Sequence, residues 1–109
     1  MKPDGISIII CGYNAEKRIV PALEALQEQK FSKEKIPWEV IVVDNDSSDN
    51  TSRISKETWY KNPVTDIKIV QEKTPGLMYA REKGLSVAAF DIVSFISNSF
   101  LSFEYFKPK

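Results

Sequence analysis

The sequence predicts an α/β protein built on a parallel β-sheet. Four short apolar runs alternate with three segments of helical periodicity, in the order β-α-β-α-β-α-β. Each connection is long enough to cross over the sheet, and such crossovers join parallel strands with a right-handed turn. In this class of fold the first and fourth strands are neighbours, which gives the strand order 3-2-1-4 with helices on both faces.

The first strand is expected over residues 6–11, because this predominantly apolar run is typical of a strand buried on both faces. A helix follows, and Asn14 is its expected N-cap. Pro21 implies either a later start of the helix, near Val20, or a kink, because proline is tolerated in the first turn but not in the helix interior. Three apolar residues then recur at helical spacing: Ile19, Leu23 and Leu26.

The second strand is expected over residues 38–44, where another apolar run ends in an acidic turn. The residues Asp49-Asn50-Thr51 are typical of a helix cap, and the helix behind them carries Ile54 and Trp59. A proline at position 63 stops this helix.

The third strand is expected over residues 67–71, the third helix over 77–89 and the fourth strand over 92–97. Gly84 lowers the helix propensity of its segment, which indicates close packing of that helix against the sheet.

The last segment, residues 98–109, differs from the rest and carries four aromatic side chains in an order with neither helical nor strand periodicity. We therefore expect one domain over residues 1–97, followed by a divergent aromatic tail. A tail this apolar is not typical of a disordered end. It is expected to pack under the sheet, to pair with another chain in a homo-oligomer, or to be a remnant.

The composition excludes several classes of function. Fifteen basic and fifteen acidic residues give a net charge of zero, which does not favour a nucleic-acid partner. One cysteine and no histidine exclude an intramolecular disulfide, thiolate or imidazole metal sites and His-dependent nucleophilic catalysis. A metal would need oxygen ligands, which favours Mg or Mn. No apolar run is long enough to span a membrane, and the cysteine usage favours a cytoplasmic location.

Two strand ends carry the residues that point to a binding site. The first strand ends in Cys11-Gly12-Tyr13-Asn14, and the second delivers Asp44 into a turn rich in Ser, Asp and Asn. Open α/β sheets bind ligands at the carboxyl ends of their strands. The two turns together therefore predict a small-molecule site.

Four blocks resemble family 2 glycosyltransferases in the family's own order. Residues 7–16 resemble the opening strand with its Tyr-Asn turn, and residues 42–51 resemble the Val-Asp-Asp/Asn-Gly-Ser block. Residues 76–84 are similar to the Gly-x-x-x-Ala-Arg helix, and residues 91–96 resemble the strand that leads to the metal-binding Asp-x-Asp. The resemblance implies the nucleotide-sugar-binding half of a Rossmann-like, three-layer GT-A fold, and an inverting glycosyl transfer to an unknown acceptor.

The resemblance also implies a set of nucleotide-binding residues: Cys11, Gly12, Tyr13, Glu16, Asp44 and Arg81. Tyr13 would lie against the base or ribose, with backbone groups of the preceding two residues lining the same pocket. Asp44 would accept a hydrogen bond from the base or ribose, and Arg81 would hold Asp44 or a phosphate.

Each of these residues also has a purely structural interpretation. Asp is common at turns, so Asp44 can be a turn residue. Tyr13 can be an ordinary half-buried aromatic residue, and Cys11 can contribute to packing alone. Arg81 can form a surface salt bridge, and Glu16 can stabilise the first turn of a helix. The acidic and amide side chains at positions 46, 49 and 50 are expected to be local turn and cap groups.

The sequence departs from the family at the metal motif. The positions that correspond to Asp-x-Asp read Ser97-Asn98-Ser99, and hydroxyl groups bring no charge to a hard dication. Mg or Mn is expected for the family but not in this chain, so we expect weak binding of a nucleoside-diphosphate sugar. No catalytic residue is identified. The alternative function is a truncated, catalytically inactive nucleotide-binding or remnant module.

Overall fold

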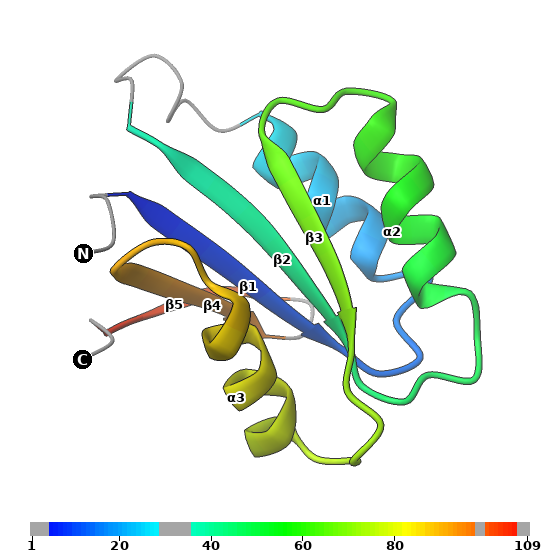
Figure 1. Ribbon diagram of the computed structural model, residues 1–109. Helices are drawn as coiled ribbons and strands as arrows, with labels where there is room; N and C mark the ends of the chain where they lie inside the picture. The colour runs from blue at the N-terminus through cyan, green and yellow to red at the C-terminus, as the bar shows by residue number, and fades with distance from the viewer. Residues whose placement is uncertain (1–4, 29–35, 98–99, 107–109) are drawn as a thin grey trace.

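A computed structural model describes residues 5–28, 36–97 and 100–106. It contains one five-stranded sheet with the order β3-β2-β1-β4-β5, shown in Figure 1. The strands are β1 (Ile6–Gly12), β2 (Trp38–Asp44), β3 (Asp66–Gln71), β4 (Ile92–Ser97) and β5 (Phe100–Phe106). The helices are α1 (Ile19–Gln27), α2 (Thr51–Tyr60) and α3 (Leu77–Val87).

The parallel sheet and its strand order confirm the prediction from the sequence. Strand β1 pairs in parallel with both β2 and β4, and β2 pairs in parallel with β3. All four strands lie within one or two residues of their expected bounds. Strands β2 and β3 lie on one side of β1, and β4 lies on its other side. The order of the strands therefore reverses between β1 and β4, which is the switch point of the sheet.

Strand β5 was not predicted, and the sheet continues where the sequence analysis expected no regular element. It pairs antiparallel with β4, with a register irregularity at Ile96/Ser97. Apolar residues occupy both odd and even positions of Phe100–Phe106, so the alternation of apolar and polar residues that is typical of a half-buried strand is missing from the sequence. The remaining tail positions, 98–99 and 107–109, lie outside the described residues.

The helices cover both faces of the sheet, as expected (Figure 1). Helices α1 and α2 pack on one face and α3 packs on the other. The core on the first face includes Ile8, Ile10, Leu23, Leu26, Val40 and Trp59. The core on the second face includes Ile9, Ile41, Val43, Ala80, Val93 and Phe95.

Helix α1 begins without the expected side-chain cap. Its N-cap position is Arg18, which makes no capping hydrogen bond with its side chain. Asn14 was the wrong candidate: it adopts a left-handed φ of 47°, and its Oδ1 accepts a 2.8 Å hydrogen bond from the Ser48 amide instead. Pro21 does lie in the first turn, as predicted, and the helix begins at Ile19, one residue before the expected start.

Helix α3 packs closely on the sheet at Gly84, which confirms the interpretation of that glycine. A Cβ atom at this position would lie 2.6 Å from Cγ2 of Ile9, a fully buried residue of the central strand β1. The helix ends at Val87, before the expected Ala89, because the Ala89 amide donates to the Glu39 carboxylate over 2.6 Å instead of continuing the helical ladder.

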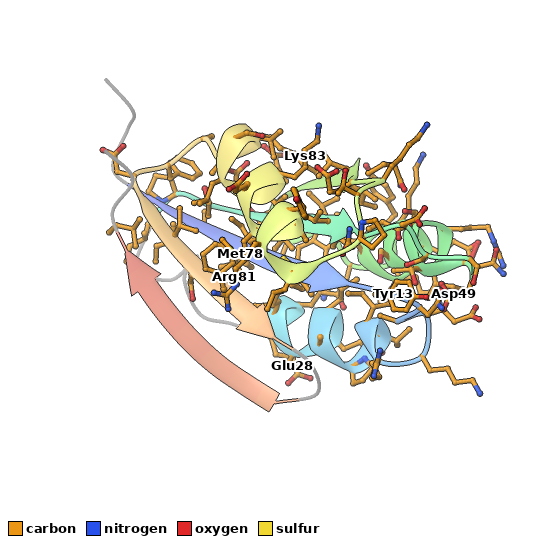
Figure 2. The ribbon with its side chains drawn as sticks, turned by 90° about the horizontal axis from the view of Figure 1, so that it is seen from below. Tyr13, Glu28, Asp49, Met78, Arg81 and Lys83 are labelled. Carbon is orange, nitrogen blue, oxygen red and sulfur yellow. The ribbon has the colours of Figure 1, made fainter. Side chains whose placement is uncertain are left out.

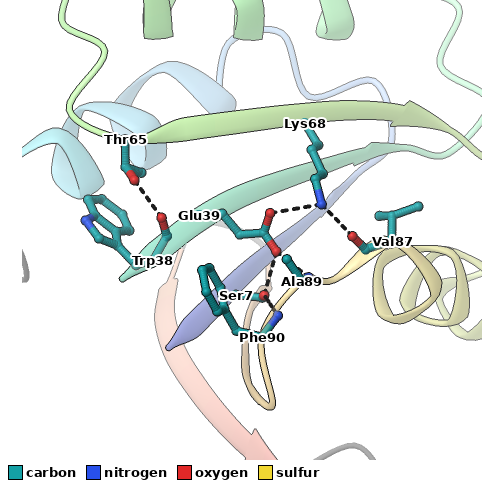
Figure 3. A network of polar contacts seen from close by, with 8 residues as sticks. All are labelled: Ser7, Trp38, Glu39, Thr65, Lys68, Val87, Ala89 and Phe90. Carbon is teal, nitrogen blue, oxygen red and sulfur yellow. Dashed lines mark hydrogen bonds and ion pairs between the residues drawn. The ribbon is translucent and has the colours of Figure 1, made fainter. Parts of the chain in front are cut away.

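Glu39 is the centre of a buried polar network near the amino end of the sheet (Figure 3). Its carboxylate accepts a 2.7 Å hydrogen bond from Ser7 Oγ and pairs with Lys68 Nζ at 3.1 Å. Lys68 also donates to the backbone oxygen of Val87 over 2.7 Å. These contacts fix the connection from α3 to β4, so the network is structural and lies away from the strand ends that form the predicted site.

None of the helices in the described part of the chain has the length and apolar character that crossing a membrane requires.

Candidate functional site

The two polar turns predicted to form a site do meet at one edge of the sheet. Gly12 ends β1 and Asp44 ends β2, and the two residues are register partners in the parallel pair. The Asn45 amide donates to the Gly12 carbonyl over 2.8 Å, which continues the pairing past the strands. We call this edge the rim; it comprises the turns at residues 11–16 and 44–51.

Side-chain hydrogen bonds join the two turns of the rim. The amide of Ala15 donates to Thr51 Oγ1 over 2.9 Å, and Asn14 bonds the backbone of the facing turn. Thr51 is fully buried at the start of α2. The rim is therefore one rigid unit, in which each turn supplies partners for the polar groups of the other.

Asp49 is one of the groups that hold this unit together. One carboxylate oxygen accepts a 3.1 Å hydrogen bond from the Thr51 amide, and the other accepts a 3.2 Å bond from the Glu16 amide. Burial raises the pKa of this carboxyl, but the hydrogen bonds from Thr51 and Glu16 outweigh it and leave the pKa of Asp49 below its ordinary value. These contacts agree with the prediction of a local turn and cap group.

Asp44 is likewise engaged within the protein, and its side chain is only 5% exposed. One oxygen accepts a 3.1 Å hydrogen bond from the Ser47 amide, and the other accepts one from the Ser52 hydroxyl. Ser52 Oγ in turn accepts a 2.7 Å bond from Gln71 Nε2, on the neighbouring strand β3. The contacts of Asp44 are those of a turn-forming residue, and its predicted contact with a nucleotide stays a prediction.

A pocket of about 300 Å³ opens where β1 ends, between the first turns of α1 and α3. Three of the predicted site residues line it, namely Cys11, Gly12 and Tyr13. The other three, Glu16, Asp44 and Arg81, are not among its lining residues. The pocket lies at the switch point of the sheet, where ligands bind in folds of this class.

Tyr13 directly follows the end of β1, and the residue is 59% exposed. Its side chain is labelled in Figure 2. Its backbone oxygen accepts a 3.2 Å hydrogen bond from Nη2 of Arg18. An aromatic face open to solvent beside a pocket can stack on a planar ligand group. Leu77, at the start of α3, is 53% exposed and borders the same pocket.

Cys11 and Arg81 lie near each other on the α3 side of β1. Burial raises the pKa of the Cys11 thiol to about 11, and the opposing effect of the Arg81 charge is smaller. The thiol is therefore protonated and unreactive at neutral pH, which agrees with a lining role. Arg81 lies on α3 (Figure 2), and its guanidinium is 5.0 Å from the centre of the Phe95 ring of β4, in a cation–π contact.

Asn45 is a pocket residue that the sequence analysis did not single out. Its side chain is buried and makes three hydrogen bonds to the loop before α3. Nδ2 donates to the carbonyls of Glu72 and Thr74 over 3.0 and 2.8 Å, and Oδ1 accepts from the Gly76 amide over 3.0 Å. Gly76 has a φ of 134°, a conformation that favours glycine. Asn45 thereby fixes the start of α3 at the pocket.

Comparison with known families identifies the class of protein that this fold and site define. The sequence model described as "Glycosyl transferase family 2" matches residues 7–98. The chain belongs to glycosyltransferase family 2.

Two curated relatives illustrate the match. Glycosyltransferase AglE of Haloferax volcanii is 32% identical over 93 residues, which are 84% of this chain and 29% of the relative. A dolichyl N-acetyl-glucosaminyl phosphate diacetamido-dideoxy-glucuronosyltransferase of Methanococcus voltae is 35% identical over 86 residues, or 79% of this chain and 26% of the relative. The chain thus spans roughly a quarter to a third of the length of such relatives, and 27% of a Bacillus subtilis relative.

Solved structures of glycosyltransferases share the fold. The mannosyltransferase PcManGT of Pyrobaculum calidifontis, in complex with GDP-Man and Mn²⁺, superposes with a TM-score of 0.78 at 26% identity over 86% of this chain and 27% of that chain. TarS of S. aureus in complex with UDP-GlcNAc gives a TM-score of 0.71 at 33% identity, covering 87% of this chain and 26% of that chain. The sheet is therefore that of the GT-A glycosyltransferases.

The residues present do not fit the divalent metal of the family. The Ser97-Asn98-Ser99 segment offers hydroxyl and amide groups in place of two carboxylates, and positions 98 and 99 lie outside the described residues. Within the part of the chain that the structure describes, no three His, Cys, Asp or Glu side chains come together in a way that could hold a metal ion. The carboxylates of Asp44 and Asp49 already accept hydrogen bonds within the rim.

Proposed function

We propose that this chain binds a nucleoside-diphosphate sugar in the pocket at the end of β1 and forms the donor-binding part of an inverting glycosyltransferase. The observation that carries the proposal is the position of the pocket: it opens at the switch point of a GT-A sheet, with Tyr13 at its edge. Relatives that share this part of the fold include complexes with GDP-Man and UDP-GlcNAc.

The lining of the pocket suits a nucleoside. The exposed Tyr13 ring offers a stacking face for a base, and Leu77 adds an apolar wall. Cys11 and Gly12 line the pocket where the ribose would lie. We assign Asp44 to the same site as a residue that shapes the turn and that accepts a hydrogen bond from the base or ribose, not from the phosphates, if Ser52 releases one oxygen.

We further propose that no divalent metal binds at Ser97-Asn98-Ser99 and that the chain acts in the cytoplasm, in keeping with a sequence that has a single cysteine. Self-association is part of the same proposal. Strand β5 is one of the two outer strands of the described sheet, and an outer strand with unpaired backbone groups is a template for a second copy.

A second candidate function is a binding module without transfer chemistry. The absence of both carboxylates from the metal motif favours it, because a leaving diphosphate needs a compensating charge. The two candidates differ in turnover: both bind a nucleotide, but only a transferase, or its complex with further protein, releases sugar from the donor.

Titration of the purified chain with uridine and guanosine diphosphates, with Mn²⁺ and with EDTA, tests the proposal. We expect saturable binding weaker than micromolar, because no metal screens the diphosphate, and equal affinity under both conditions. Tyr13→Ala should weaken binding about tenfold without loss of stability, since its ring is 59% exposed. Absence of binding to either nucleotide contradicts the proposed function, and a micromolar, Mn²⁺-dependent affinity contradicts the assignment of the metal site.

A further inference from the structure

The charge of the pocket comes from one residue. Of the described residues that line the pocket, Arg18 alone carries a formal charge, and the remaining lining is apolar or neutral. The first turn of α1, which begins directly after Arg18, faces the same space and adds the partial positive charge of a helix N-terminus. The described lining of the pocket therefore carries a positive formal charge, although the chain as a whole has no net charge.

The acidic residues of the rim do not cancel this charge. Asp44 and Asp49 accept hydrogen bonds within the protein, and none of the four acidic residues of the rim (Glu16, Asp44, Asp46 and Asp49) is among the residues that line the pocket. The carboxylate of Glu39 is paired with Lys68 near the opposite end of the strands. An anion that entered the pocket would meet a guanidinium and no facing carboxylate among the described lining residues.

The guanidinium is held in place at the edge of the pocket. Nη2 of Arg18 donates to the backbone oxygen of Tyr13, at 3.2 Å. A guanidinium has five N–H donors in a planar arrangement, so this contact leaves donors that suit a phosphate, which guanidinium binds in two-pronged geometry. The residue that orients Arg18 is also the one whose ring is offered to the base.

We propose that Arg18 binds the diphosphate group of the nucleotide and supplies the positive charge that a divalent metal supplies elsewhere in the family. The inference rests on the proposed function and adds to it the residue that holds the phosphates. The nucleoside then lies against Tyr13 and the phosphates extend toward the start of α1. Binding of the nucleoside diphosphate is consequently independent of metal and sensitive to salt.

The test compares Arg18→Ala with Lys17→Ala in the full chain. Lys17 is an exposed neighbour of the same charge that does not line the pocket, so it controls for a general loss of positive charge. For each variant the dissociation constants of uridine, uridine diphosphate, guanosine and guanosine diphosphate are measured by calorimetry in EDTA, at two salt concentrations. Thermal unfolding reports whether the variants are folded.

A charge-assisted hydrogen bond to a phosphate corresponds to a factor of about 10 to 100 in affinity. Arg18→Ala should lower the affinity for the bound diphosphate by this factor, leave the affinity for its nucleoside unchanged and remove most of the salt dependence. Arg18→Lys should recover part of the loss, and Lys17→Ala should behave like the wild-type chain.

Two results would overturn the inference while leaving the proposed function intact. One is an unchanged diphosphate affinity in Arg18→Ala; the other is an equal loss for nucleoside and diphosphate, which would mark Arg18 as a residue that shapes the pocket. A wild-type chain that binds none of the four compounds would overturn the proposed function and the inference together.

Discussion

Replacing Asn45 by alanine should loosen the loop before α3 and open the pocket. The side chain is 7% exposed and makes three hydrogen bonds to that loop, with lengths of 2.8 to 3.0 Å. A buried hydrogen bond contributes about 1 kcal/mol net, so the three together contribute about 3 kcal/mol. Because the loop residues at positions 73–76 are exposed, water replaces part of what is lost. We expect a fall of about 2 kcal/mol in the free energy of unfolding.

Urea unfolding and amide hydrogen exchange measure the two effects separately. The amide of Gly76, which donates to Asn45 Oδ1, should lose its protection from exchange in Asn45→Ala. Asn50→Ala is the matched control: Asn50 is exposed at the N-cap of α2, and its side chain makes no capping hydrogen bond. The control should change stability by less than about 0.5 kcal/mol.

The role assigned to Asn45 is wrong if the Asn45→Ala variant unfolds at the same urea concentration as the control and the Gly76 amide stays protected. That result would mean that the backbone of the loop holds its conformation without the side chain. A loss of stability with unchanged exchange at Gly76 would place the effect in the core and not in the loop.

Three further perturbations test other parts of the molecule. Gly84→Ala should destabilise the fold by about 1–2 kcal/mol in urea unfolding, because the clash with the buried Ile9 outweighs the gain of about 1 kcal/mol in helix propensity; equal stability would contradict the close packing. The pKa of Asp49 is lower in the folded chain than its ordinary value of 3.8, so its ionised carboxylate stabilises the fold above that pH. This stabilisation is lost as the pH falls through the folded pKa, and the difference in stability between the wild-type chain and Asp49→Asn should therefore shrink below about pH 4. Deleting residues 100–109 should convert a dimer to monomer or aggregate in sedimentation, whereas a wild-type monomer at about 100 μM, unchanged by the deletion, would exclude self-association through β5.

The parallel core could be predicted because the two central strands carry continuous apolar runs, Ile8–Ile10 and Val40–Val43, each with a polar turn behind it. Val40–Val43 is fully buried on both faces, which removes the alternation of a half-exposed strand and leaves a signal that is hard to mistake. Gly84 was informative for a similar reason, since a glycine inside a helix needs a packing explanation. These local sequence patterns were sufficient to predict the core, because each of them indicates directly that its residues are buried.

The features that could not be predicted depend on contacts between distant segments. Asn14 has the composition of a helix cap, but its side chain bonds a turn that lies 34 residues away in sequence. In the sequence, nothing distinguishes Asn45 from the other polar residues of its turn. Its hydrogen-bond partners belong to the loop at Glu72–Gly76, 27 to 31 residues further along the chain. No sequence motif marks Arg18, and it lies at the pocket only because of the position of α1.

The distribution of charge at the rim explains why an acidic turn is compatible with an anionic ligand. Three aspartates between positions 44 and 49 would repel a diphosphate if they faced it across a few ångströms of low-dielectric space. Asp44 and Asp49 instead accept hydrogen bonds from amides and hydroxyls, and none of the three aspartates is among the described residues that line the pocket. The charges that line the pocket determine which ligands it attracts, and among the described lining residues the charged one is Arg18. The same acidic turn can therefore fix the geometry of the site while a single arginine sets its preference for phosphate.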